Sequence, residues 1–191
     1  MKKSRKSYMI VIGILIALIV VSISMLVKVY NEKCGWQDRA ANDNYSNWDH
    51  IYFMTTQVEK MGFTKQDVEE ISLYVNGILY ASEPDLWPRF SGPVTSAFLR
   101  HYYAGLALDI ASSQLDDEQL RLAMELFKDA TMDLKELSRA ILDMAEAADA
   151  RVQLLDRDSA ICKQAEEMVL EYSEEYDERF SRFYSDLNPE S

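Results

Sequence analysis

Glycine, proline, cysteine and histidine are all scarce in this chain, whose 191 residues hold six glycines, four prolines, two cysteines and two histidines. A glycine-rich phosphate loop, a nucleophile elbow and a cysteine–histidine zinc motif are missing. The paired Glu-x-x-His motifs of di-iron helical proteins are missing as well. His50 follows Asp49 directly, but adjacent helical residues point about 100° apart and do not face each other. We therefore expect no metal, no cofactor and no enzymatic activity.

Basic residues are also in short supply, with 20 lysines and arginines against 32 acidic residues and a formal net charge of −12. All 32 acidic residues lie after residue 29. The same part of the chain holds only fifteen of the basic residues, so it carries a net charge of −17. A negative field excludes nucleic acid as a partner, because nucleic-acid binding needs a basic surface. The charge favours solubility and a basic partner, or simply a solvated acidic surface.

One long apolar run interrupts this polar composition. Between Tyr8 and Val29 the only charged residue is Lys28. About 20 helical residues, at about 1.5 Å each, cross a hydrocarbon core of about 30 Å. A cleaved signal peptide is the alternative, but its apolar region is shorter, about 7–15 residues, and is followed by a small-x-small cleavage site, which the residues from Met25 to Tyr30 do not provide. We therefore predict an uncleaved transmembrane anchor over residues 8–29.

The basic residues on either side of this run indicate its orientation. Four precede the run, Lys2, Lys3, Arg5 and Lys6, and Lys28, Lys33 and Arg39 lie at its other end. The positive-inside rule then predicts a cell-membrane protein with a cytoplasmic N-terminus and an extracytoplasmic C-terminal domain. We expect a basic cytoplasmic head (1–7), the anchor (8–29), a juxtamembrane stalk or loop (30–45), an acidic helical domain (46–187) and a tail (188–191).

Beyond the stalk, apolar residues recur at helical spacing and no stretch alternates long enough to be a strand. Helices are predicted over about 46–61, 64–82 and 93–113, with Gly62 and a proline-rich loop between them. A capping signal at Asp116 opens a stretch up to Leu187 that lacks glycine and proline and has an apolar residue at every seventh position. The polar segment 156–159 is predicted to break this stretch.

The expected fold class follows from these elements. It is all-α, with one N-terminal transmembrane helix followed by an extracytoplasmic helical bundle of about five helices. The last two helices are expected to be long, antiparallel and coiled-coil-like.

Two groups of aromatic residues are candidate surfaces for a protein partner. The first lies in the proline-rich loop and consists of Leu86, Trp87, Arg89 and Phe90. The second is a stripe at helical spacing, which we call the aromatic stripe: Tyr172, Tyr176, Phe180, Phe183 and Tyr184. Trp, Tyr and Arg are enriched at binding hot spots. The alternatives are that the loop plugs one end of the bundle and that the stripe packs against the first helices.

The two cysteines, Cys34 and Cys162, can pair in an oxidising compartment. Cys34 can instead link two chains, and Cys162, which lies on an apolar stripe, can instead be a buried free thiol.

Together these features predict a non-enzymatic scaffold or regulator of a membrane or envelope protein, anchored through residues 8–29 and able to form homo-oligomers. The alternative is a ligand-sensing helical bundle that works through a separate signalling partner.

Overall fold

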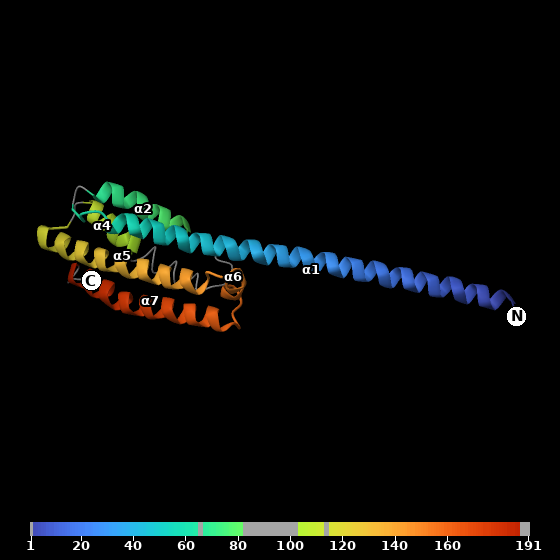
Figure 1. Ribbon diagram of the computed structural model, residues 1–191. Coiled ribbons are helices and arrows are strands. Elements are labelled where there is room, and N and C mark those ends of the chain that lie inside the picture. The colour runs from blue at the N-terminus through green and yellow to red at the C-terminus, as the bar shows by residue number, and fades with distance from the viewer. Residues whose placement is uncertain (1, 65–66, 82–102, 113–114, 188–191) are drawn as a thin grey trace. The chain divides into compact units, whose positions relative to one another are not determined.

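The computed structural model describes residues 2–64, 67–81, 103–112 and 115–187. These ranges contain six helices and no strand, so the predicted all-α class is confirmed (Figure 1). The chain divides into two compact units. We call Met1–Arg39 the N-terminal unit and Ala40–Ser191 the helical unit.

Helix α1 (Lys2–Glu59) belongs to both units. Residues 30–45 are all helical, so they do not form a loop, and the juxtamembrane stalk over these residues stays a prediction. The segment holds a single glycine, Gly35, and no proline, and six of its sixteen residues are good helix formers. One glycine costs a helix about 1 kcal/mol relative to alanine, which is too little to end it.

Within the helical unit, one face of α1 enters the core. Trp48, Ile51 and Val58 are fully buried on this face, as their helical spacing predicts. The helix ends at Glu59, and Phe63 beyond it has a left-handed backbone with φ of 51°. This conformation is uncommon for a residue with a side chain, and it turns the chain toward the next helix.

Helix α2 (Val68–Ala81) begins after a hydrogen-bonded turn. The backbone N–H and the hydroxyl of Thr64 both donate to the carboxylate of Asp67, at 2.9 and 2.8 Å. Apolar side chains then recur on the core face of the helix. The buried ones are Ile71, Val75 and Ile78.

Helix α2 packs closely against α1 and against α4 (Ala104–Ser112). A Cβ atom on Gly77 would lie 3.0 Å from the Met54 side chain, so the glycine permits this approach of α1 and α2. Helix α4 also contacts α2, and it buries two small residues, Ala104 and Ala107. Helix α4 covers the last part of the predicted helix over 93–113, and residues 82–102 lie outside the described residues.

The final part of the chain forms α5 (Asp117–Met144), the short α6 (Ala148–Leu154) and α7 (Ala160–Leu187). The capping signal at Asp116 is confirmed, because its side chain accepts from the Gln119 N–H while the Gln119 side chain accepts from the Asp116 N–H. The predicted break over 156–159 is also confirmed, and the Ser159 hydroxyl accepts from the Cys162 N–H at 3.0 Å.

A second break, between α5 and α6, was not predicted. The Arg151 guanidinium donates to the carbonyl oxygens of Ala145 at 3.2 Å and Glu146 at 3.5 Å, which satisfies backbone groups where α5 ends. The same guanidinium stacks on the Tyr45 ring at 3.7 Å and donates to the Asn42 side chain at 3.1 Å. Arg151 therefore joins α6 to α1 within the helical unit.

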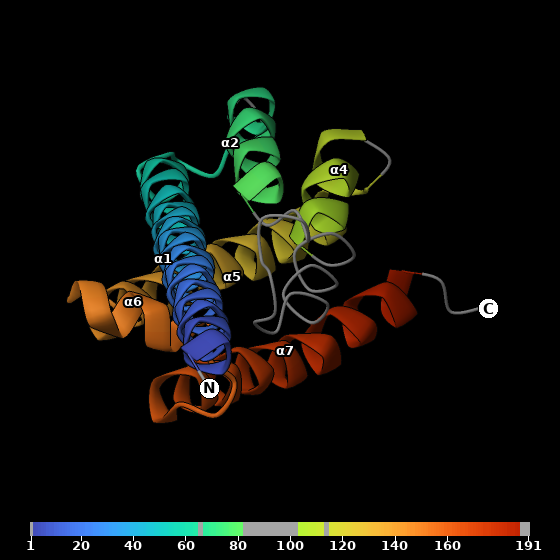
Figure 2. The ribbon, with the colours of Figure 1, turned by 90° about the vertical axis from the view of Figure 1, so that its right-hand side faces the viewer.

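Helix α5 lies between α7 on one side and α2 and α4 on the other (Figure 2). Helices α5 and α7 run antiparallel, since Arg179 pairs with Asp129 at 2.9 Å while Tyr176, earlier in α7, donates to Asp133, later in α5. The largest fully buried side chains of the core are aromatic and come from α1, α5, α7 and the residue before α4. They are Trp48, Tyr103, Phe127, Tyr176 and Phe180.

Candidate functional sites

The aromatic stripe of α7 faces the interior of the helical unit. Tyr176 and Phe180 are fully buried, and their rings contact each other with centroids 5.8 Å apart. Tyr172, Phe183 and Tyr184 are half-buried and pack against the same core. Tyr176 and Phe180 therefore lie in the interior and not on an exposed ridge.

The hydroxyl groups of the stripe have acidic partners on two neighbouring helices. Tyr176 donates to the carboxylate of Asp133 on α5, and Tyr184 donates to Asp109 on α4 at 2.7 Å. Burial, followed by the nearby carboxylates, raises the pKa of both tyrosines above the usual range. These hydrogen bonds join α7 to α4 and α5.

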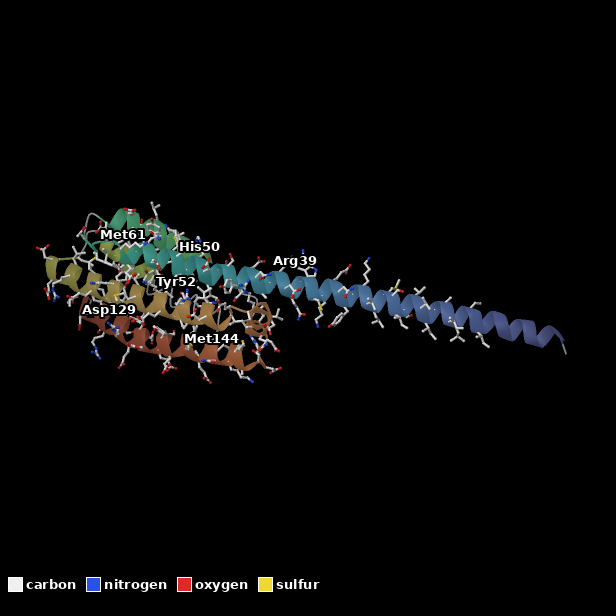
Figure 3. All side chains as sticks on the ribbon, in the orientation of Figure 1. Arg39, His50, Tyr52, Met61, Asp129 and Met144 are labelled. Atoms are coloured by element: carbon white, nitrogen blue, oxygen red, sulfur yellow. The ribbon has the colours of Figure 1, made fainter. Side chains whose placement is uncertain are left out.

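The loop candidates Leu86, Trp87, Arg89 and Phe90 lie outside the described residues. Among the histidines, His101 also lies outside them, and His50 is half-buried on α1 (Figure 3).

The two cysteines have different environments, and both are free thiols. Cys162 is 1% exposed in the helical unit, where burial, followed by the negative charges of Glu166 and Asp156, raises the pKa of its thiol. Cys34 is half-buried in the N-terminal unit. The structure therefore corresponds to the predicted alternative in which Cys162 is a buried free thiol.

A hollow of about 350 Å³ lies beside the first half of α5. Its apolar lining comes from Phe63, Leu120 and Met124, and Phe63 lies edge-on to the buried ring of Phe127. Charged side chains complete the lining: Asp117, Arg121, Glu125 and Lys128. The sequence did not indicate this hollow, whose lining combines Phe63, in the loop after α1, with residues of α5.

Arg121 is the best-held charged group at the hollow. Its guanidinium forms ion pairs with Glu118 at 2.6 Å and with Glu125 at 2.8 Å. Hydrogen bonding and charge from Arg121 lower the pKa of the Glu118 carboxyl. The hollow thus combines an apolar lining with charged side chains that are largely exposed.

The apolar part of the N-terminal unit differs from every element of the helical unit, because its large side chains are exposed. The exposure of these side chains ranges from 48% at Ile12 to 69% at Leu26. Among the described residues, this is the one helix that is long and apolar enough to cross a membrane, and none of its apolar window is buried.

Within the described part of the chain, no group of three or more His, Cys, Asp or Glu side chains is placed to hold a metal ion. Comparison with protein-family models, curated proteins and solved structures gave no match for this chain.

Proposed function

We propose that this chain is a single-pass membrane protein that holds an acidic helical bundle outside the cytoplasm, where the bundle acts as a non-enzymatic scaffold or regulator of a membrane or envelope protein. The observation that carries the proposal is the exposed apolar surface of α1 between Ile12 and Val29. Removing one large apolar side chain from water is worth roughly 1.5–3 kcal/mol. A helix that leaves so many of them uncovered is suited to lipid and not to water.

The charge pattern supports the orientation. Basic residues are denser before the apolar run than after it, which favours retention of the N-terminus in the cytoplasm. The helical unit would then lie on the outer side, bound to the membrane through residues 8–29.

The surface of the helical unit supports a partner with basic groups. Exposed carboxylates lie along the solvent face of α7. They belong to Glu167, Glu171, Glu174, Glu175 and Glu178. Complementary charge steers association and selects against wrong partners. A basic surface on an envelope protein fits this face better than nucleic acid or anionic lipid does.

The anchor and its orientation are tested first, in cells. Carbonate-washed membranes should retain the protein, and protease added to intact cells should remove the helical unit. A protein that is extracted by carbonate has no transmembrane anchor. A helical unit that resists protease until the cells are permeabilised lies on the cytoplasmic side, and the orientation is then wrong.

The scaffold role is tested by purifying the full-length protein from its native membrane in mild detergent and identifying co-purifying proteins. A stoichiometric partner that is lost from the triple variant Glu171→Gln, Glu174→Gln, Glu178→Gln would support the proposal. The matched control is Asp149→Gln, at an exposed position on α6. Recovery of the same partner from the triple variant would contradict a role for the acidic face.

The hollow beside Phe63 favours ligand sensing as the second candidate function. A ligand that raises the melting temperature of the wild-type protein should lose this effect in Leu120→Arg, which fills the apolar floor. Leu122→Arg is the matched control, since Leu122 lies on the same helix with 43% of its side chain exposed. Equal shifts in the two variants would place the ligand elsewhere.

A further inference from the structure

We propose that Tyr30, Trp36 and Arg39 form a second, interfacial contact with the membrane, in which the phospholipid headgroup layer holds the turns of α1 that follow the apolar run. This inference rests on the proposed membrane anchor, and it adds a surface and a lipid region that the anchor alone does not require.

The first observation is the geometry of Arg39. Its Nε donates to the carbonyl oxygen of Gly35 at 3.0 Å, and its guanidinium carbon lies 4.4 Å from the centroid of the Trp36 ring. The side chain therefore folds back by about one helical turn, toward the apolar run. A guanidinium held this way retains N–H groups that can bind a phosphate oxygen.

The second observation is the exposure of two aromatic rings. Trp36 and Tyr30 are each 67% exposed in the N-terminal unit. Trp and Tyr are enriched at membrane–water interfaces, where the ring is shielded while its polar atom remains hydrated. Such exposure, which is unfavourable in water, is the expected arrangement for rings that meet lipid headgroups.

The third observation is the spacing along α1. Tyr30 directly follows the apolar run, and Trp36 lies about 9 Å farther along the helix axis at about 1.5 Å per residue. The polar layer adds about 5–8 Å to each side of the hydrocarbon core. Because helical side chains lean toward the N-terminus, the Trp36 ring reaches back into this layer.

The charges around these rings are mixed and favour the headgroup layer over an acidic protein. Lys33 and Arg39 are basic, Asp38 is acidic, and Lys28 lies 3.9 Å from Glu32. Lysine and arginine stems also snorkel along apolar surface while their charged ends reach the phosphates.

The test measures the depth of Trp36 in reconstituted full-length protein. The variant Trp48→Phe, Trp87→Phe leaves Trp36 as the only tryptophan. In phosphatidylcholine–phosphatidylglycerol vesicles we expect a blue-shifted emission, quenching by lipids that are spin-labelled at the headgroup, and loss of quenching by aqueous iodide. Adding Arg39→Gln should restore part of the iodide quenching, since the ring then loses its cationic partner.

The matched control moves the probe along the same helix. The variant Trp36→Phe, Trp48→Phe, Trp87→Phe, Phe53→Trp places the only tryptophan at a position that is 53% exposed in the helical unit. This probe should be quenched by iodide and not by labelled lipid. Circular dichroism of each variant reports whether the helices are retained.

A second measurement does not depend on replacing the buried Trp48. One variant, Cys162→Ala, carries a nitroxide on Cys34, and the other lacks both native cysteines and carries a nitroxide at Asn76→Cys. The nitroxide on Cys34 should collide with a water-soluble nickel chelate less often than the nitroxide at position 76. Two results would overturn the headgroup contact and leave the anchor intact, provided that the protein floats with the vesicles. One is an equal collision rate for the two nitroxides, and the other is iodide quenching of Trp36 equal to that of the control probe. Protein that does not float with the vesicles would overturn the anchor itself.

Discussion

The hydroxyls of Tyr103 and Thr131 lie 2.7 Å apart inside the helical unit, and Thr131 donates in turn to the carbonyl oxygen of Phe127 at 2.8 Å. The Tyr103 ring stacks on the Phe127 ring with centroids 4.7 Å apart. This arrangement joins the start of α4 to α5 through both polar and apolar contacts. It also excludes water from a phenol that must stay neutral, since burial raises the pKa of Tyr103 above the usual range.

Alkaline pH is therefore expected to destabilise the helical unit. Tyrosines in the unfolded chain ionise near pH 10, whereas the raised pKa of Tyr103 keeps it protonated in the folded state. Its contribution is complete below about pH 10 and is lost above that value, by at most about 1.4 kcal/mol per pH unit. Urea denaturation at pH 7, 9, 10.5 and 11.5 measures this loss. Tyr103→Phe should show a shallower decline, and equal declines in the two proteins would contradict the assignment.

Phe180→Ala is expected to lower the free energy of unfolding by about 3–5 kcal/mol, because the ring is fully buried between helices. Leu170→Ala, on the same helix but 43% exposed, should cost much less. Urea denaturation of both variants by circular dichroism makes the comparison. A small and equal effect of the two changes would mean that the aromatic stripe lies on the surface.

Asn44→Leu is expected to raise the free energy of unfolding by about 1–3 kcal/mol. Asn44 is 1% exposed, and neither its amide nitrogen nor its amide oxygen has a hydrogen-bond partner. An unsatisfied buried polar group costs about this much, and leucine has a similar branched shape. Asn76→Leu, at an exposed position on α2, should change stability by less than about 0.5 kcal/mol. A lower melting temperature for Asn44→Leu would mean that the amide has a bonding role.

Thiol labelling is expected to separate the two cysteines. Cys162 is buried and has a raised pKa, so a maleimide should modify it at the rate of local or global unfolding. Cys34 should react faster, because it is only half-buried. Mass spectrometry after timed labelling, with Cys34→Ala and Cys162→Ala as controls, gives the two rates. Rapid modification of Cys162 in native protein would contradict its burial.

Local signals predicted much of this fold. Asp116 and Gln119 fix the start of α5 with their own side chains, and the segment 156–159 contains the polar residues that a turn and an N-cap require. Trp48, Ile51 and Val58 are buried as their spacing predicts. In each case the determining interactions lie within a few residues of one another, so the sequence displays them.

Features that depend on distant residues were missed. The end of α5 contains neither glycine nor proline, and Arg151, which binds the Ala145 carbonyl there, also binds Asn42, 109 residues away. The aromatic stripe has helical spacing, but only its contacts with Asp109 and Asp133 reveal which helices it meets. The hollow beside α5 brings Phe63, whose backbone is left-handed, together with residues of α5 more than 50 positions later, and no residue pattern indicated this contact.

The link between Arg151 and Asn42 has a consequence for the synthesis of this protein. These two side chains are 109 residues apart, so α1 is made long before the helix that completes its surroundings. At about 5–20 residues per second, the ribosome needs about 5–20 s to make the intervening chain. During that interval the buried face of α1, with Trp48 and Ile51, lacks its later partners and is a natural target for a chaperone.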